Sequence, residues 1–185
     1  MAYFCTKLLL MARPAIGTYS PGFATYIQKV QETDIFEALK NQQETVNHFF
    51  QNIPEEKHGY AYAPGKWTLK DMMQHLIDSE RVINYRSLCF ARQERSSLPS
   101  FDEDLYAANA NAKTRTWESL CNELKAVREG TNYLYQSFNE DMLVLEGVAN
   151  NNTATALSMG FATVGHLYHH VYVIETKYLV AAESC

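Results

Sequence analysis

Apolar side chains recur at helical spacing in four long segments of the sequence, and no segment shows a useful length of the two-residue alternation typical of strands. The segments run from about 33 to 53, 69 to 92, 117 to 138 and 155 to 182. Helices of this length bury their apolar stripes most simply against one another. The pattern therefore predicts an all-α fold, a four-helix bundle, as a single domain over residues 33–185.

The residues before these segments predict where the helices begin. A threonine side chain accepts a hydrogen bond from the first turn of a helix, and Thr68 with Asp71 forms a variant of the capping box. Pro54 is expected to end the first helix, because proline cannot continue one. The expected N-caps of the four helices are Thr33, Thr68, Thr116 and Thr155.

The remaining segments are rich in glycine, proline and polar residues. Residues 1–32 are expected to form an N-terminal arm, partly irregular, with one short helical turn near 23–30. The connection between the second and third helices is long, with a short helix predicted over 102–109, and such a connection often serves a function. Residues 139–153 are predicted to be a turn region.

Composition and charge exclude several classes of protein. The net charge is -5 and there is no block of Lys or Arg, which argues against a nucleic-acid-binding surface. No stretch approaches the ~18 apolar residues of a membrane span, and Lys7 interrupts the apolar N-terminal run, which argues against a secretory signal. Met11 is an alternative start to Met1. The four cysteines are widely spaced without a CxxC pair, so we expect reduced thiols and a cytoplasmic protein.

The stretch GHLYHH holds half of the six histidines of the chain and lies in the fourth predicted helix. His166 and His170 are four residues apart, so their side chains lie on one face and can bind one metal ion. His75, in the middle of the second helix among apolar neighbours, is the best candidate for a third ligand. A single histidine in an apolar helix is more often a satisfied core residue. The three together, in a chain with few histidines, favour a metal site in the bundle.

Alternative assignments follow from the same spacing. His169 is three residues from His166 and competes with His170, but its angular offset is larger. Leu167 stands where the HExxH motif of zinc proteases has its general base, so the sequence does not indicate a protease of that kind. Asp78, one turn after His75, is either a residue that orients His75 or accepts a proton, or a solvated surface carboxylate.

Other reactive side chains are expected to be structural. Cys89 and Cys121 lie in apolar helical patterns and are predicted to be inert core residues rather than nucleophiles. Tyr85, Tyr168 and Tyr172 are predicted to lie in the core or to line a pocket. Three imidazoles suit zinc, nickel, copper and iron alike, so the ligand set alone does not identify the metal.

Three stretches of the sequence resemble the DinB/YfiT-like superfamily of metal-binding four-helix bundles. They are YAPGKWTLKDMMQHLIDSERVINYRSLCFAR, LPSFDEDLY and GHLYHHVYVIETKYL, and the resemblance runs from about Gly17 to Leu179. It implies a divalent metal, often zinc or nickel, held by one histidine of the second helix and two of the last. In this sequence these are His75, His166 and His170. The resemblance also implies an up-down-down-up bundle and a homodimer.

The resemblance leaves three functions open. Characterised relatives include thiol S-transferases, so the leading hypothesis is a transferase in which the metal activates a low-molecular-weight thiol that attacks an electrophile held near residues 101–106. The second is a metal-dependent hydrolase that uses metal-bound water, with Asp78 as a candidate proton acceptor. The third is a non-catalytic, metal-stabilised bundle that binds a small molecule or a partner in a stress response.

Overall fold

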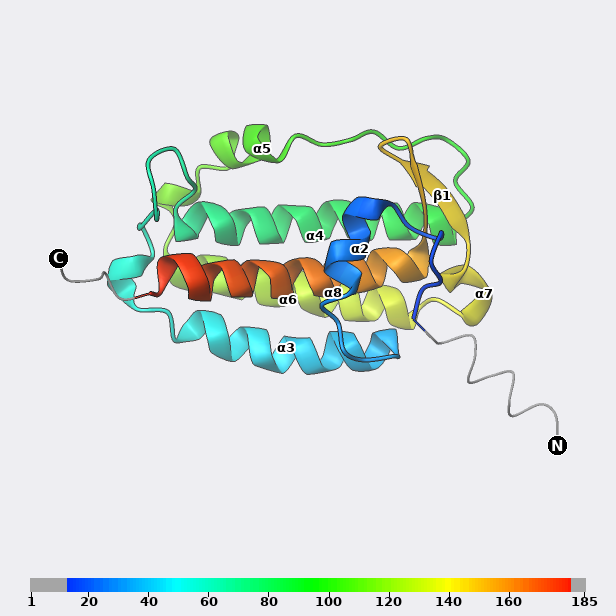
Figure 1. Cartoon of the computed structure of the whole chain (residues 1–185), viewed down its shortest axis with the longest axis horizontal. Helices are drawn as coiled ribbons and strands as arrows, with labels where there is room; N and C mark the ends of the chain where they lie inside the picture. Colours follow the sequence, from blue (N-terminus) through cyan, green and yellow to red (C-terminus); the bar gives the residue numbers. More distant parts are fainter. Residues whose placement is uncertain (1–12, 181–185) are drawn as a thin grey trace.

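The computed structural model describes residues 13–180, except for the side chains of residues 45 and 46. Four long helices lie side by side along the molecule (Figure 1), and the predicted four-helix bundle is confirmed. The bundle helices are α3 (Ile35–Gln51), α4 (Leu69–Ala91), α6 (Trp117–Gln136) and α8 (Ala156–Val173).

The order of the helices around the bundle explains the long connection. Both α3 and α4 pack against α6 and α8, so the first two helices lie diagonally across the bundle. In Figure 1 the colours show that α3 and α8 run one way and that α4 and α6 run the other, an up-down-down-up arrangement. Because α4 and α6 are parallel neighbours, residues 92–116 must return along the whole length of the bundle. This crossover carries α5 (Glu103–Asn109) and the short 3-10 turn η2 (Ala112–Thr114), while a similar turn, η1 (Glu55–Lys57), follows α3.

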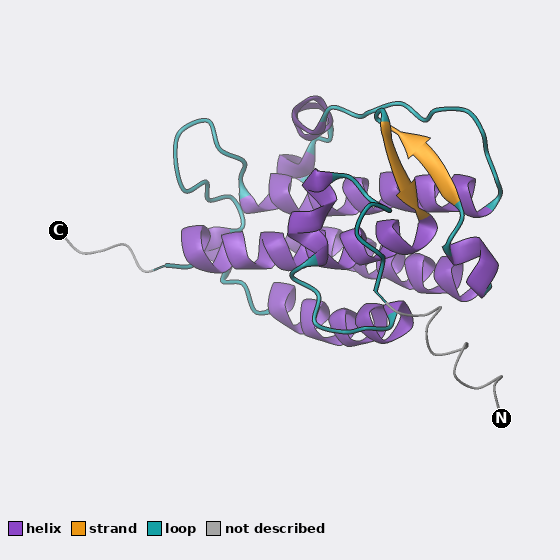
Figure 2. Cartoon of the chain, turned by 45° about the vertical axis from the view of Figure 1, so that its right-hand side comes forward, coloured by secondary structure: helices purple, strands orange, loops and turns teal. Residues whose placement is uncertain are grey.

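A β-hairpin replaces part of the turn region expected over 139–153. A short helix, α7 (Glu140–Leu143), leads into β1 (Glu146–Ala149), which pairs antiparallel with β2 (Asn152–Thr155). Asn150 and Asn151 join the strands with φ of 50° and 57°, the left-handed values of a tight hairpin turn. Figure 2 shows the hairpin beside one end of the bundle, where β1 contacts α4.

The N-terminal arm contains α2 (Pro21–Ile27), which packs against α8 (Figure 1). Gly165 permits this contact, because a Cβ built at that position would lie 2.0 Å from the carbonyl oxygen of Tyr26. Arg13 secures the end of the arm by donating hydrogen bonds to the carbonyls of Ile27 and Val30. The predicted helical turn in the arm is therefore present and is docked on the bundle. Residues 1–12, including the alternative start, lie outside the described part.

Three of the four predicted N-cap residues cap their helices in the structure. Thr68, Thr116 and Thr155 each accept a hydrogen bond from the first turn of their helix. Asp34, not Thr33, caps α3, and its carboxylate accepts from the amide of Glu37 at 2.9 Å. The prediction of Thr33 was thus wrong by one residue.

The last helix and two tyrosines also differ from expectation. The α-helical part of the last segment ends at Val173 and continues as one π-helical turn, η3 (Ile174–Tyr178). Tyr85 and Tyr172 are 58% and 59% exposed, so placing them in the core or a pocket was wrong, whereas Tyr168 is partly buried. Within residues 13–180, no helix is long and apolar enough to cross a membrane.

Candidate metal centre

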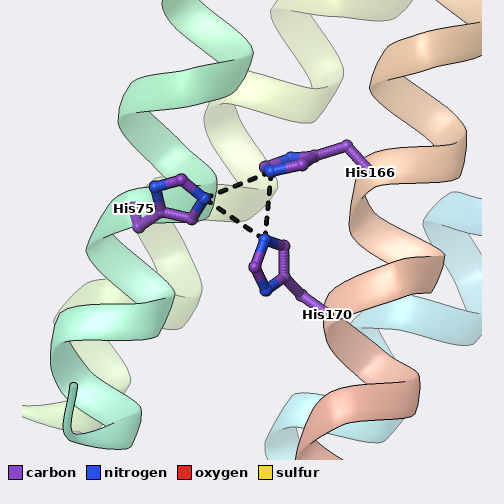
Figure 3. Close-up of side chains that lie close together, drawn as sticks. All are labelled: His75, His166 and His170. Atoms are coloured by element: carbon purple, nitrogen blue, oxygen red, sulfur yellow. Dashed lines mark hydrogen bonds between the residues drawn. The ribbon is translucent and has the colours of Figure 1, made fainter. Parts of the chain in front are cut away.

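Three histidine side chains from two helices converge in the bundle core (Figure 3). His75 comes from α4, and His166 and His170 come from successive turns of α8. The distances between their Nε2 atoms are 3.1 Å for His75 and His166, 3.2 Å for His75 and His170, and 3.0 Å for His166 and His170. The i, i+4 spacing read from the sequence thus puts two rings on one face of α8, and packing against α4 adds the third.

Burial keeps these imidazoles neutral. It lowers the pKa of His75 to about 4 and the pKa of His170 to about 3, and charge repulsion from the neighbouring histidines adds to the shift at His170. Burial likewise holds the pKa of His166 well below its ordinary value, again with repulsion from its neighbours. At neutral pH all three side chains are therefore in the deprotonated form that binds metal ions.

The donor set fits a divalent metal ion. Each neutral imidazole has one N–H, so in at least one of the three Nε2 contacts two lone pairs or two N–H groups must face each other. A cation shared by the three lone pairs removes that conflict. Metal–nitrogen bonds of about 2.0–2.1 Å at angles of roughly 90–110° separate ligand nitrogens by about 2.8–3.4 Å, which covers all three distances.

The other histidines have different partners. His169 packs its ring against Tyr26, with the ring centroids 5.5 Å apart, and does not join the cluster. His48 contacts Asn52 through Nδ1 at 3.1 Å. His58 stacks on Trp117 with ring centroids 4.3 Å apart. The structure thus brings together the three histidines favoured from the sequence.

The residues around the cluster include Ser79, which the sequence analysis did not single out, and Trp67, which lies in the first stretch that resembles the DinB/YfiT-like superfamily. Ser79 places its hydroxyl 3.4 Å from Nδ1 of His75, and the ring of Trp67 lies 4.7 Å from the His75 ring. His75 and Ser79 are four residues apart in the sequence, and this helical spacing could have predicted the contact between them. Asp78 instead accepts a hydrogen bond from Gln74 at 3.0 Å and lies 3.8 Å from Arg81, and burial raises its pKa. A role for Asp78 in chemistry stays a prediction.

A pocket of about 400 Å³ reaches the cluster at His166. It runs along α4 and α8, and its outer walls come from the arm, the crossover and the hairpin. The residues that carry the argument below are Phe23, Tyr26, Ser79, Arg86, Phe101 and Glu103. The edge of the Tyr26 ring packs on the His166 ring, with centroids 5.2 Å apart.

The described cysteines lie apart from this pocket. Neither Cys89 nor Cys121 lines it, and each is partly buried. Burial raises the pKa of Cys121 to about 11, so its thiol is a poor nucleophile at neutral pH. Cys5 and Cys185 lie outside the described residues.

Comparison with known proteins gives the family. The sequence model of the DinB superfamily matches residues 38–174, a range that contains all three clustered histidines. The chain belongs to the DinB superfamily. No curated protein gives a significant match to the sequence.

Two solved structures share the DinB fold with this chain. YfiT from Bacillus subtilis, described as a probable metal-dependent hydrolase with an unusual four-helix bundle topology, aligns with a TM-score of 0.68 at 15% identity, over 90% of this chain and 94% of YfiT. A mycothiol-dependent maleylpyruvate isomerase aligns with a TM-score of 0.62 at 11% identity, over 80% of this chain and 60% of the isomerase. At these identities the likeness shows the fold.

Proposed function

We propose that this DinB-superfamily protein is a divalent-metal-dependent thiol S-transferase with His75, His166 and His170 as the metal ligands. The observation that carries the proposal is the position of the histidine cluster, because its member His166 lines a pocket large enough for a small molecule. A structural metal site is closed by its protein ligands, whereas a catalytic one has access for substrate. The ligand set and its place beside a pocket favour catalysis over a metal that only stabilises the bundle.

A transferase that uses an external thiol is consistent with a pocket wall that has no described cysteine. Neither described cysteine lines the pocket. A bound divalent ion supplies Lewis acidity that lowers the pKa of a thiol. In the transfer, the thiol loses its proton, its sulfur forms a bond to an electrophilic carbon, and the leaving group departs with the electron pair. The name of the mycothiol-dependent isomerase shows that one protein of this fold works with a low-molecular-weight thiol.

The residues of this chain would orient the ligands and hold the substrate. Ser79 restrains the ring of His75, and Tyr26 packs against that of His166. Such contacts orient metal-binding imidazoles. The aromatic rings of Phe23 and Phe101 give the pocket walls that suit an apolar electrophile.

A hydrolase is the second candidate, and Glu103 favours it. This residue lines the pocket, and burial, together with repulsion from Asp104 and Asp102, raises the pKa of its carboxyl group. A carboxylate with a raised pKa is a better proton acceptor, which a hydrolase needs beside an activated water. Asp78 is the other candidate acceptor. The hydrolase suggested for YfiT belongs to the same reaction class.

The test is turnover by the metal-loaded protein. We expect conjugation of glutathione or bacillithiol to 1-chloro-2,4-dinitrobenzene, lost in His170→Ala and retained in His48→Ala, whose histidine is exposed and outside the cluster. An absence of turnover and of binding with every thiol tried would overturn the transferase. Thiol-independent ester hydrolysis that falls in Glu103→Gln or Asp78→Asn would support the hydrolase.

Zinc or nickel as the metal, a homodimer, a cytoplasmic location and a stress role stay predictions.

A further inference from the structure

Arg86 is a buried cation on the wall of the pocket. Its side chain belongs to a residue only 7% exposed, and one guanidinium nitrogen donates to the carbonyl oxygen of Pro99 at 2.8 Å. The guanidinium carbon lies 5.8 Å from the centre of the Phe101 ring. These contacts hold the guanidinium at the pocket and leave most of its N–H groups for other acceptors.

Arg86 has no counter-ion in the described part of the chain. No carboxylate oxygen of residues 13–180 is recorded within 4 Å of its guanidinium, whereas Arg128, also deeply buried, pairs with Glu80 at 2.8 Å. Glu103 lines the same pocket but forms no ion pair with Arg86. Burial lowers the pKa of Arg86, as expected for a charge removed from water without compensation. A buried cation is normally paired, so a missing anion is the simplest completion of this site.

The position of Arg86 relates it to the histidine cluster. Ser79 and Arg86 lie on the same face of α4, both line the pocket, and seven residues of helix separate their backbones by about 10 Å. On the antiparallel helix α8, Met159 and His166 also line the pocket and are also seven residues apart. Side chains of a helix lean toward its N-terminus, which brings the guanidinium closer to the cluster. The pocket lining thus includes Arg86 and, toward the histidine cluster, Ser79 and His166.

We propose that this pocket binds a small carboxylate, with its anionic group on Arg86 and its apolar body between the rings of Phe23 and Phe101. A guanidinium binds a carboxylate through two parallel N–H···O bonds, which fixes both position and orientation. The far end of such a molecule reaches the histidine cluster. Naming this end as the reacting one rests on the proposed function, whereas binding of the carboxylate at Arg86 does not.

The competing explanation is that Arg86 only tethers the crossover through Pro99. The two explanations differ in whether a ligand's charge matters. The probes are benzoate and its neutral isostere benzamide, titrated into the full-length protein by calorimetry or by NMR shifts. We expect benzoate to bind at least about tenfold more tightly than benzamide, and Arg86→Gln to remove that preference. Arg95→Gln removes the same charge from an exposed site on the crossover and should bind benzoate as the wild type does.

The remaining outcomes also decide the matter. Equal binding of the two probes, no binding of benzoate to the wild type, or unchanged binding in Arg86→Gln would overturn the proposal. If Arg86→Gln does not fold, a crystal structure of the wild type with benzoate decides the question, and it must show the carboxylate on Arg86. The same titration with metal-free protein separates the two proposals, because we expect benzoate to bind there even if the metal-dependent transferase is refuted.

Discussion

The neutral imidazoles of His75, His166 and His170 predict a measurable metal content. Their Nε2 atoms lie within 3.0–3.2 Å of one another, so each removed ring deletes one of the three ligands. We expect about one divalent ion per chain in the wild type and a large loss in His75→Ala and His170→Ala. Elemental analysis of purified proteins measures this.

Two further variants sharpen that measurement. Ser79→Ala removes the hydroxyl beside His75 but no ligand, and loss of such a contact typically lowers metal affinity by about 10–100-fold. His48→Ala is the matched control, since its exposed ring contacts Asn52 and should leave the metal content unchanged. Metal retained at wild-type stoichiometry in both His75→Ala and His170→Ala would show that the ligands lie elsewhere.

At the scale of elements, the contact between α2 and α8 depends on one glycine. A Cβ at Gly165 would lie 2.0 Å from the Tyr26 carbonyl oxygen, and backbone cannot yield as a flexible side chain does. We expect Gly165→Ala to displace α2, to lower the free energy of unfolding by about 1–3 kcal/mol, and to expose the arm to limited proteolysis. Because Tyr26 packs on His166, ligand binding in the pocket should weaken as well.

Gly130 supplies the control for this substitution. It lies inside α6, is exposed, and a Cβ there would meet no described atom within 4 Å. Gly130→Ala should therefore raise stability by about 0.5–1 kcal/mol through helix propensity. If thermal unfolding and proteolysis of the two alanine variants were alike, the close approach of α2 to α8 would not be important for the arm.

The bundle helices could be predicted from the sequence because their signals are local. Apolar spacing located all four, and Thr68, Thr116 and Thr155 act on amides only three residues away. The prediction of the N-cap of α3 was wrong because Thr33 and Asp34 are adjacent and both residue types suit the position. The hairpin was not predicted because its strands of four residues are too short to show an alternating pattern. Tertiary contacts also hold it, such as the bridge between Leu98 and Ala149.

The residues of the candidate site also differ in whether they could be predicted from the sequence. The three histidines could be predicted from helical spacing and from their scarcity. Residues 101–106 were expected near the site, and Phe101 lines the pocket. Tyr26 could not be placed there, because the arm reaches the site through tertiary packing. The unpaired state of Arg86 is a property of three-dimensional surroundings and has no signature in the sequence.

At the scale of the whole molecule, the topology separates the bundle helices, which carry the histidine cluster, from the segments that surround the pocket. The histidines lie on two bundle helices inside the range matched by the DinB superfamily, 38–174. The parallel arrangement of α4 and α6 forces the crossover over the bundle, and this brings Phe101 and Glu103 to the pocket. The arm, with Phe23 and Tyr26, lies outside the matched range. We infer that the bundle helices serve the chemistry and that the arm and the crossover select the substrate.

The buried histidines also link the stability of the whole metal-free protein to pH. Burial lowers the pKa of His75 to about 4 in the folded state, against about 6.5 in an unfolded chain. Between these values the unfolded state binds more protons, so stability is complete above about pH 6.5 and decreases as the pH falls toward 4. At pH 5 the loss from His75 alone is roughly 2 kcal/mol relative to pH 7.5, and His170, with a pKa of about 3, adds a further loss.

Urea unfolding of the metal-free protein at pH 7.5 and pH 5 measures this dependence. Asp78 and Glu103 have raised pKa values and act in the opposite direction, since they gain stability as the pH falls. The comparison is therefore made between variants, in which those carboxylates are unchanged. His75→Ala should lose clearly less stability than the wild type between the two pH values, and His48→Ala should lose as much as the wild type does. An equal loss in all three proteins would mean that the fold does not hold His75 neutral between pH 7.5 and pH 5.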